Sequence, residues 1–298
     1  MSLRAELVRI GVRRFIKRGR RPTVAAARRS IAAAARWVPS PPAGTEVLPV
    51  DAGGVPGELI ATAASQRDRH VLFLHGGGYV TGSPALYRHF TWRIATAARA
   101  RVLAVDYRLA PEHPFPAALD DALAAYRWLH AGAADPQRTA VMGDSAGGGL
   151  ALALLLKLRD DRLERPGAAV ALSPWTDLAL TGASLSLNAV SDPMLNVAEA
   201  RLFADCYLAG VDPRNPYASP LYGNPAGLPP TLIHVGSDEI LHDDAVRIAE
   251  RLRAAGCLVE IEVWPRMPHG WHLFAPVLPE ARTAIARIGA FVDRVFAP

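Results

Sequence analysis

The sequence predicts an α/β fold, in which a mostly parallel sheet is buried between layers of helices. Short runs of apolar residues recur along the chain, and segments with helical periodicity separate them. A run that is apolar at every position suits a strand covered on both faces, as in a parallel sheet. The 298 residues are 50% hydrophobic and 20% charged, which supplies enough apolar material for a large core.

Eight segments are predicted as strands, and they alternate with five predicted helices. The strand candidates are residues 47–50, 58–63, 71–74, 102–105, 139–142, 169–172, 232–235 and 259–263. The first two lie on either side of a turn sequence, Asp51-Ala52-Gly53-Gly54. The helix candidates are residues 87–98, 117–130, 146–158, 243–255 and 280–295. Such alternation is typical of an α/β sheet.

Two segments interrupt this alternation. Residues 1–44 are helical and basic and end in Pro39-Ser40-Pro41-Pro42. Residues 178–225 separate two strands, contain many prolines, and carry a short helical pattern at 196–208. A long insertion beside a sheet is often a lid over a site. The predicted organisation is an N-terminal helical segment (1–44), a body (45–177 and 226–298) and an insertion (178–225).

The charge is divided unevenly along the chain. Residues 1–37 carry a net charge of +10 and the remaining residues −5, so the overall +5 comes from the N-terminus. A nucleic-acid-binding protein would spread its positive charge over a folded face with base-reading motifs, and no such motif is found. The early arginines are not followed by the apolar core of a secretory signal. We therefore expect a cap element whose helices bury Leu3, Leu7, Ile10, Phe15, Ile31 and Trp37, and neither a targeting signal nor a DNA-binding arm.

Membrane and metal functions are also disfavoured. The longest apolar stretch, 150–156, is far shorter than the ~20 residues of a membrane span. The only cysteines, Cys206 and Cys257, exclude a disulfide framework and a four-cysteine zinc site, and they fit a reducing compartment.

A serine motif carries the first chemical signal. Gly143-Asp144-Ser145-Ala146-Gly147 directly follows a predicted buried strand and begins a predicted helix. In such a strained turn the flanking glycines let strand and helix pack closely, and the serine oxygen projects from the sheet edge. The context predicts that Ser145 is a nucleophile.

A glycine motif is the second indication of catalytic chemistry. His75-Gly76-Gly77-Gly78 follows an earlier strand. Glycines let backbone N–H groups converge on a ligand oxygen, as an oxyanion hole requires. A dinucleotide-binding turn is excluded because the Gly-x-Gly-x-x-Gly pattern is absent.

The base and the acid should follow Ser145 in the sequence, as they do in enzymes with this serine turn. Among the later histidines, His269 lies in the loop after the last predicted strand, which returns to the sheet edge. His234 lies inside a strand, His242 at a helix start, and His272 about one helical turn beyond His269. We therefore predict His269 as the base.

The acid has four candidates in one short segment. Asp238 stands just past a strand end, whereas Asp243 and Asp244 begin a helix, where carboxylates favour the helix dipole. Glu239 adjoins Asp238 and is expected to point elsewhere. We predict Asp238 as the acid.

These stretches resemble one known family, the bacterial hormone-sensitive-lipase-like esterases (GDSAG type) of the α/β-hydrolase superfamily. The resemblance covers residues 45–298 and rests on His75 to Gly78, Tyr107 to Ala118, Gly143 to Gly148, and the surroundings of Asp238 and His269. One departure is Asp238-Glu239-Ile240, where many members have Asp-Pro-Leu. The 107–118 stretch reads as a proline-rich turn that buttresses the site.

The resemblance implies an α/β-hydrolase fold, a mostly parallel sheet of about eight strands with a helical cap formed by residues 1–44 and 178–225. It implies a triad of Ser145, Asp238 and His269, with an oxyanion hole made by the N–H groups of Gly77, Gly78 and Ala146. The implied function is a cytoplasmic serine carboxylesterase for short- to medium-chain esters, which acts through an acyl-enzyme and is often a homodimer.

No metal and no organic cofactor is expected, and the partner is a small-molecule ester; neither nucleic acid binding nor stable membrane insertion is expected. Two alternatives remain: an amide or peptide hydrolase with the same triad, and a non-catalytic small-molecule receptor on the same fold.

Overall fold

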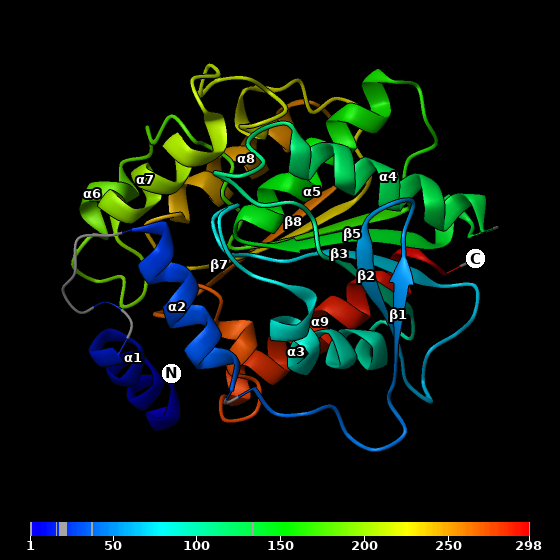
Figure 1. Cartoon of the computed structure of the whole chain (residues 1–298), viewed down its shortest axis with the longest axis horizontal. Coiled ribbons are helices and arrows are strands. Elements are labelled where there is room, and N and C mark those ends of the chain that lie inside the picture. Colours follow the sequence, from blue (N-terminus) through cyan, green and yellow to red (C-terminus); the bar gives the residue numbers. More distant parts are fainter. Residues whose placement is uncertain (1, 16, 18–22, 37, 133, 298) are drawn as a thin grey trace.

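A single eight-stranded sheet forms the centre of the protein in the computed structural model, which describes residues 2–15, 17, 23–36, 38–132 and 134–297. Its spatial order is β1-β2-β4-β3-β5-β6-β7-β8 (Figure 1). The strands are β1 (Glu46–Asp51), β2 (Pro56–Ala61), β3 (His70–Leu74), β4 (Arg101–Val105), β5 (Thr139–Asp144), β6 (Ala168–Leu172), β7 (Thr231–Gly236) and β8 (Val259–Trp264). Each predicted strand is present, with bounds shifted by only a few residues.

The sheet is mostly parallel, as predicted. β1 pairs antiparallel with β2, and β2 pairs antiparallel with β4; from β4 to β8 all neighbours are parallel. The carboxyl ends of the parallel strands therefore meet at one edge, where loops from different strands can share a site.

Helices cover both faces of the sheet and bury a separate core on each. One face packs against α4 (Ala117–Ala131), α5 (Ala146–Asp160) and α8 (His242–Ala254), and the other against α3 (Pro84–Ala97) and α9 (Pro279–Val295). Side chains of β3 alternate between the two cores: Leu72 and Leu74 join the first, Val71 and Phe73 the second. This explains why the strands are apolar at consecutive positions.

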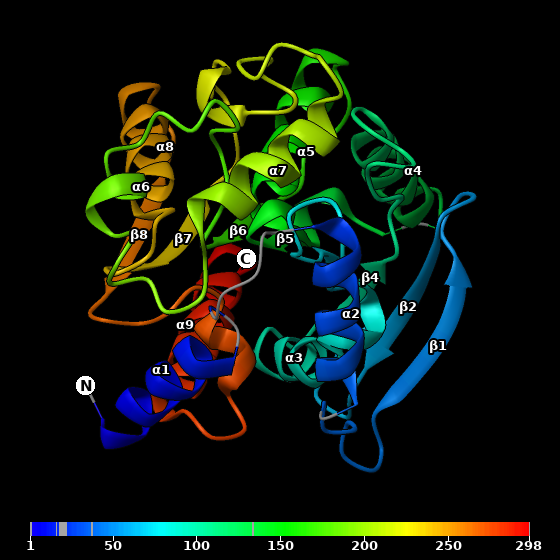
Figure 2. The same cartoon turned by 60° about the vertical axis from the view of Figure 1, so that its left-hand side comes forward.

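The remaining helices lie beside the sheet and outside these layers. They are α1 (Leu3–Phe15), α2 (Val24–Ala35), α6 (Ser184–Leu187) and α7 (Val197–Leu208), and Figure 1 shows them together to the left of the sheet. Figure 2 shows α1 beside α9, and the N–H and hydroxyl groups of Ser2 both donate to the Glu280 carboxylate at the start of α9. Within residues 178–225 the described chain contains α6, α7 and a 3₁₀ turn (Pro220–Tyr222), and no strand.

The orientation of α1 differs from the expectation. Leu3, Leu7 and Ile10 were predicted to be buried, but 79%, 61% and 55% of their surfaces are exposed. Ala5 and Val12 face the body instead, beside Arg9. The hydrogen bonds of Arg9 on this inward side are described below. Trp37 and the side chain of Phe15 lie outside the described residues.

Among the described helices, none combines the length and the apolar composition needed to cross a bilayer.

Candidate active site

Ser145 stands at a sharp turn between β5 and α5. Its backbone has φ 57° and ψ −120°, a conformation that L-residues rarely adopt. A Cβ atom at Gly143 would lie 2.0 Å from the Gly147 carbonyl oxygen, and one at Gly147 would lie 2.1 Å from that of Leu74. The close packing predicted for the two glycines is confirmed, and it holds the serine at the carboxyl edge of the sheet.

A continuous chain of hydrogen bonds links Ser145 to a histidine and a carboxylate. The Ser145 hydroxyl lies 2.9 Å from His269 Nε2, and His269 Nδ1 lies 2.7 Å from Glu239 Oε2. A carboxylate can only accept, so Nδ1 carries the proton and Nε2 is free to accept from the serine. The three side chains are at most 9% exposed, so water competes little for these bonds.

Glu239 is held on both of its oxygens. It lies in the loop after β7, and Oε1 accepts hydrogen bonds from the Gly236 N–H (2.6 Å) and the Ser173 hydroxyl (2.7 Å). Oε2 accepts from His269, and the side chain has no exposed surface. A fully buried carboxylate requires such partners, and here they fix its orientation toward the imidazole.

The structure does not place Asp238, the predicted acid, against His269, and the prediction that Glu239 points elsewhere is wrong. The Asp238 carboxylate lies 2.8 Å from Arg9 Nη1 and accepts a hydrogen bond from the Ser237 hydroxyl. The two neighbouring carboxylates therefore have different partners, one on the N-terminal helix and the other in the buried site. The available signal was the Asp238-Glu239-Ile240 sequence itself, because it places a second carboxylate where many family members have proline.

The electrostatic surroundings raise the pKa of His269 well above its ordinary value of 6.5. Burial alone would lower it, but the charge and hydrogen bond of Glu239, followed by the charges of Asp144 and Asp192, outweigh the burial. The protonated form of His269 is therefore stabilised at this position.

Asp144, which precedes the serine, has a structural setting of its own. Its Oδ2 accepts a hydrogen bond from the Tyr87 hydroxyl (2.8 Å), and Tyr87 also accepts one from the Gly76 N–H (3.1 Å). Burial is the main reason that the pKa of Asp144 rises to about 6. This network joins the turn after β5 to the glycine loop after β3.

The glycine loop places unpaired N–H groups next to the serine turn. Gly77 has φ 128°, and a Cβ atom there would lie 2.0 Å from the Thr81 carbonyl oxygen, so only glycine fits. In the described part of the chain, the N–H groups of Gly77, Gly78 and Ala146 make no hydrogen bond. They remain available for a ligand oxygen.

The 107–118 stretch buttresses this loop, as the sequence indicated. The Tyr107 hydroxyl donates to the His75 carbonyl oxygen (2.7 Å), and its ring stacks on the His75 imidazole at 4.2 Å. The Ala110 N–H donates to the Tyr79 carbonyl oxygen (2.9 Å).

The other candidate histidines lie away from the serine hydroxyl. His234 is fully buried in β7, as predicted, and its Nδ1 lies 3.1 Å from His272 Nε2. His272 follows the His269 loop in a 3₁₀ turn (Trp271–Phe274), and His242 begins α8. These contacts give His234 and His272 a packing role behind the site.

Asp243 and Asp244 have structural partners. Asp243 Oδ2 accepts from the Ser184 N–H (2.9 Å), and buried Asp244 Oδ2 accepts from the N–H groups of Thr176 (2.7 Å) and Asp177 (2.8 Å). This placement agrees with the prediction that Asp243 and Asp244 are not catalytic. Their carboxylates bind backbone N–H groups of other segments, whereas they were expected only to complement the dipole of their own helix.

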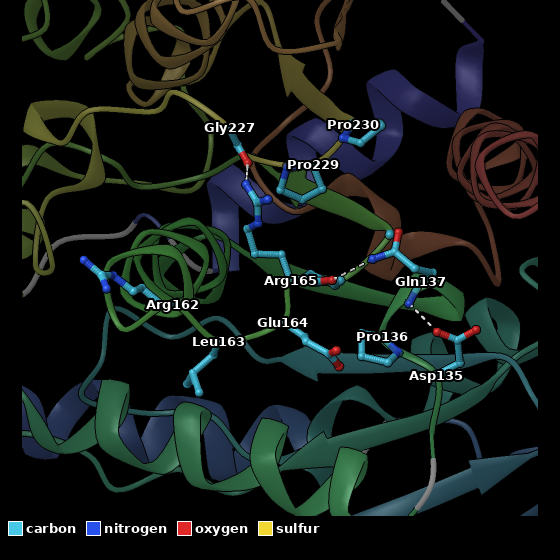
Figure 3. A pocket seen from close by; sticks show the side chains of 12 residues that line it. Asp135, Pro136, Gln137, Arg162, Leu163, Glu164, Arg165, Gly227, Pro229 and Pro230 are labelled. Carbon is cyan, nitrogen blue, oxygen red and sulfur yellow. Dashed lines mark hydrogen bonds between the residues drawn. The ribbon is translucent and has the colours of Figure 1, made fainter.

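A surface cavity of about 490 Å³ lies at the opposite edge of the sheet (Figure 3). It is formed by the segments that precede β5, β6 and β7, and Asp135, Arg162, Arg165 and Pro229 line it. None of its lining residues belongs to the Ser145 cluster. Within the described residues, no group of three or more histidine, cysteine or acidic side chains could hold a metal ion.

Comparison with known proteins identifies the family. Residues 71–273 match a family described as having the alpha/beta hydrolase fold. A curated acetyl-hydrolase of Streptomyces hygroscopicus is 51% identical over 229 residues, which is 77% of each chain. A putative acetyl-hydrolase, LipR, of Mycobacterium tuberculosis is 36% identical over 97% of this chain and 94% of its own.

Solved structures agree with the sequence relatives. An esterase of the bacterial hormone-sensitive lipase family superposes with a TM-score of 0.95 at 44% identity, covering 100% of this chain and 99% of its own. The chain belongs to the bacterial hormone-sensitive-lipase-like esterases of the α/β-hydrolase superfamily. As a member of this esterase family, it is a carboxylic-ester hydrolase.

Proposed function

We propose that this carboxylic-ester hydrolase acts through a triad of Ser145, His269 and Glu239 and forms an acyl-enzyme intermediate. The observation that supports the proposal most directly is the unbroken hydrogen-bond chain from Ser145 Oγ through His269 to the buried Glu239. An intact nucleophile, base and acid also weigh against the receptor alternative, which needs no such chain.

In the first half-reaction, Ser145 Oγ attacks the ester carbonyl carbon while His269 Nε2 takes the hydroxyl proton. Glu239 keeps the imidazole in the tautomer with the proton on Nδ1 and stabilises the imidazolium. The carbonyl oxygen becomes an oxyanion, which we assign to the N–H groups of Gly77, Gly78 and Ala146. When the intermediate collapses, the ester C–O bond breaks and His269 gives its proton to the leaving alcohol.

In the second half-reaction, water replaces the alcohol. His269 takes a proton from the water, the resulting hydroxide attacks the acyl carbon, and the same N–H groups stabilise the second oxyanion. Collapse releases the carboxylic acid and returns the proton to Ser145. Neither half-reaction needs a metal or an organic cofactor.

We propose that α1 and α2 together with residues 178–225 form a cap over this site, above the body formed by 45–177 and 226–298. A Cβ atom at Gly78 would lie 2.3 Å from the Phe203 ring, so α7 of the insertion packs directly on the proposed oxyanion loop. Phe203 thus forms a wall beside the acyl group, which favours short- to medium-chain acids. The acetyl-hydrolase names of two relatives and the p-nitrophenyl butyrate soak of a solved esterase, EstE5, support this range.

We also propose a cytoplasmic location and a homodimeric state. Cys206 and Cys257 are both free thiols, which agrees with a reducing compartment. Cell fractionation tests the first proposal, and light scattering of the purified protein tests the second.

Turnover of p-nitrophenyl acetate and butyrate tests the triad. The variants compared are Ser145→Ala, His269→Ala, Glu239→Gln and Asp238→Asn. Ser145→Ala and His269→Ala should each lower kcat by about 10⁴-fold or more. Glu239→Gln should lower it by about 10²–10⁴-fold, because an amide cannot stabilise the imidazolium.

Asp238→Asn is the matched control for the acid, because it makes the same chemical change at the adjacent residue. It should retain at least about tenfold more activity than Glu239→Gln. The reverse order of the two variants would restore Asp238 as the acid.

A further inference from the structure

The guanidinium group of Arg9 connects the N-terminal helix to two loops of the body and to one loop of the insertion. Nη1 lies 2.8 Å from Asp238 Oδ2 and donates to the Arg266 carbonyl oxygen at 2.7 Å. Nη2 lies 3.5 Å from the Ser191 carbonyl oxygen. Only 11% of the Arg9 side chain is exposed, although it belongs to a helix that leaves Leu3 and Leu7 in solvent.

Two of these loops carry the proposed acid and base. The acid loop, residues 237–241, follows β7, and the base loop, residues 265–270, follows β8. Asp238 is the residue before Glu239, and Arg266 lies in the β8 loop that leads into His269. One cation thus connects the backbone of the base loop with a carboxylate of the acid loop. It adds to two direct contacts of the acid loop, from the Ser237 N–H to the Trp264 carbonyl oxygen at the end of β8 (3.0 Å) and from the Arg266 N–H to the Ser237 hydroxyl (2.8 Å).

The insertion supplies further anchors of the acid loop. The Asn188 side-chain amide donates to the carbonyl oxygens of Ser237 (3.1 Å) and Glu239 (2.8 Å). Asp192 Oδ2 accepts from the Ile240 N–H (2.9 Å), and Lys17 donates to the Asp192 carbonyl oxygen. The N-terminal segment and the insertion therefore both anchor the acid loop.

The charges around Arg9 favour this arrangement. Glu6 lies 4.0 Å from Arg9 on the same helix and also pairs with the Arg266 side chain at 3.3 Å. The Asp238 side chain is 18% exposed, so removing Arg9 leaves a mostly buried carboxylate without its cation. An uncompensated buried carboxylate is strongly unfavourable, so we expect the Asp238 side chain to turn toward water and the acid loop to shift with it.

We propose that Arg9 is a positioning residue for catalysis: by joining the loops of Asp238 and Arg266, it holds Glu239 at hydrogen-bonding distance from His269. The proposal rests on the function proposed above. Arg9 touches neither substrate nor reacting atoms in this scheme. It makes the chemical step depend on the docking of the N-terminal helix.

The expected signature lies in kcat and in the pH profile. A displacement of the acid loop by about 1 Å weakens the acid–base pair, and misplacements of that size cost up to about 10²-fold in rate. The charged groups that face His269 are Glu239, Asp144 and Asp192. Glu239 is the one that Arg9 positions, so losing Arg9 should shift the acidic midpoint of kcat/KM to lower pH.

The experiment compares Arg9→Met, Arg9→Lys and Asp238→Asn with the wild type and with Arg14→Met. Arg14 is an exposed arginine of the same helix, and its side chain forms no hydrogen bond or ion pair with another described residue. We expect Arg9→Met to lower kcat about tenfold, to leave KM within about twofold and to lower the pH midpoint. Arg9→Lys should recover part of the loss, because an ammonium pairs with Asp238 but cannot span both loops. Arg14→Met should match the wild type.

A double variant tests the connection through Asp238. Arg9→Met/Asp238→Asn should be no slower than the worse single variant, because both changes remove one ion pair. Multiplicative losses overturn the proposal.

An Arg9→Met enzyme with the wild-type pH midpoint also overturns the proposal, even if its kcat or its melting temperature falls. A purely structural role would leave the pKa of His269 unchanged. If Arg9→Met does not fold, the pH midpoint of kcat/KM is measured for Asp238→Asn, and a midpoint equal to that of the wild type overturns the proposal. Glu239→Gln in the same assay separates the two proposals: full activity there refutes the triad, whereas a large loss with an unaffected Arg9→Met refutes only the role of Arg9.

Discussion

At the scale of single residues, two adjacent carboxylates differ in their burial and in their partners, and this difference is the basis for proposing Glu239 as the acid. Glu239 is completely enclosed, and both oxygens accept hydrogen bonds, whereas Asp238 is partly exposed and pairs with Arg9. A buried carboxylate in a preorganised setting interacts strongly with an imidazole, because little solvent screens their charges. This explains why Glu239 dominates among the groups that raise the pKa of His269.

The pH profile of ester hydrolysis follows from that shift. Only neutral His269 can accept the serine proton, and its pKa lies above 6.5. As the pH falls through the raised pKa, the base is protonated and kcat/KM should decline, with a midpoint above 6.5. In Glu239→Gln the burial penalty remains without the carboxylate that contributes most to the rise, so the midpoint of the residual activity should move to lower pH than in the wild type. Stopped-flow rates from about pH 5 to 9 provide the measurement, and identical midpoints in the two enzymes would contradict the assigned pair.

At the scale of elements, the site depends on how closely α5 approaches β3. The first turn of α5 packs against the carbonyl oxygens of Leu74 and His75, which begin the glycine loop. The serine turn and the proposed oxyanion loop are thus held in contact by backbone atoms on both sides. Backbone cannot move aside as a flexible side chain can.

Gly147→Ala should therefore disable the enzyme. The new Cβ atom would lie 2.1 Å from the Leu74 oxygen and 2.5 Å from the His75 oxygen, so the glycine loop must shift. We expect kcat to fall by about 10²-fold or more, or soluble yield to be lost. Gly11→Ala is the matched control, because among the described residues nothing outside its own helix backbone lies within 4 Å of its Cβ position, and its activity should equal that of the wild type. Wild-type kcat for Gly147→Ala, measured on p-nitrophenyl acetate, would show that the contact is not needed.

At the scale of the whole molecule, the basic N-terminal segment is complementary to the more acidic body. Arg28 forms a bidentate pair with Glu112 (both contacts 2.7 Å) and donates to the carbonyl oxygens of Val80 and Ala110. Arg9 pairs with Asp238. The two helices therefore contact both the stretch that buttresses the glycine loop and the acid loop.

Deletion of residues 1–37 tests the importance of this docking. It should expose apolar surface and promote aggregation, change acyl-chain selectivity, and lower kcat while leaving measurable turnover of acetate esters, because Ser145 and His269 remain. A panel of nitrophenyl esters from acetate to palmitate, with light scattering, gives the comparison with the full-length enzyme. Unchanged selectivity and stability would show that the segment is only a tail.

Much of the fold and part of the site were predictable from the sequence because local patterns carry them. Consecutive apolar residues marked the strands from Val71 to Val235, since a strand buried on both faces has no polar side. The Gly143–Gly147 motif fixed the turn at Ser145, since only glycine permits that approach. His269 followed from chain order and from its place in the last loop at the sheet edge.

Tertiary structure alone decided the partners of neighbouring charged groups. Asp238 and Glu239 have similar chemistry and adjacent positions, and only the arrival of Arg9 from the far end of the chain and of Ser173 from β6's loop separates their roles. In the same helix as Arg9, Leu3, Leu7 and Ile10 face solvent, against the expectation from their apolar spacing. The spacing of apolar residues indicates which side chains prefer burial. An ion pair, in contrast, forms only where segments distant in the sequence meet. One buried guanidinium with several acceptors can outweigh a short apolar stripe.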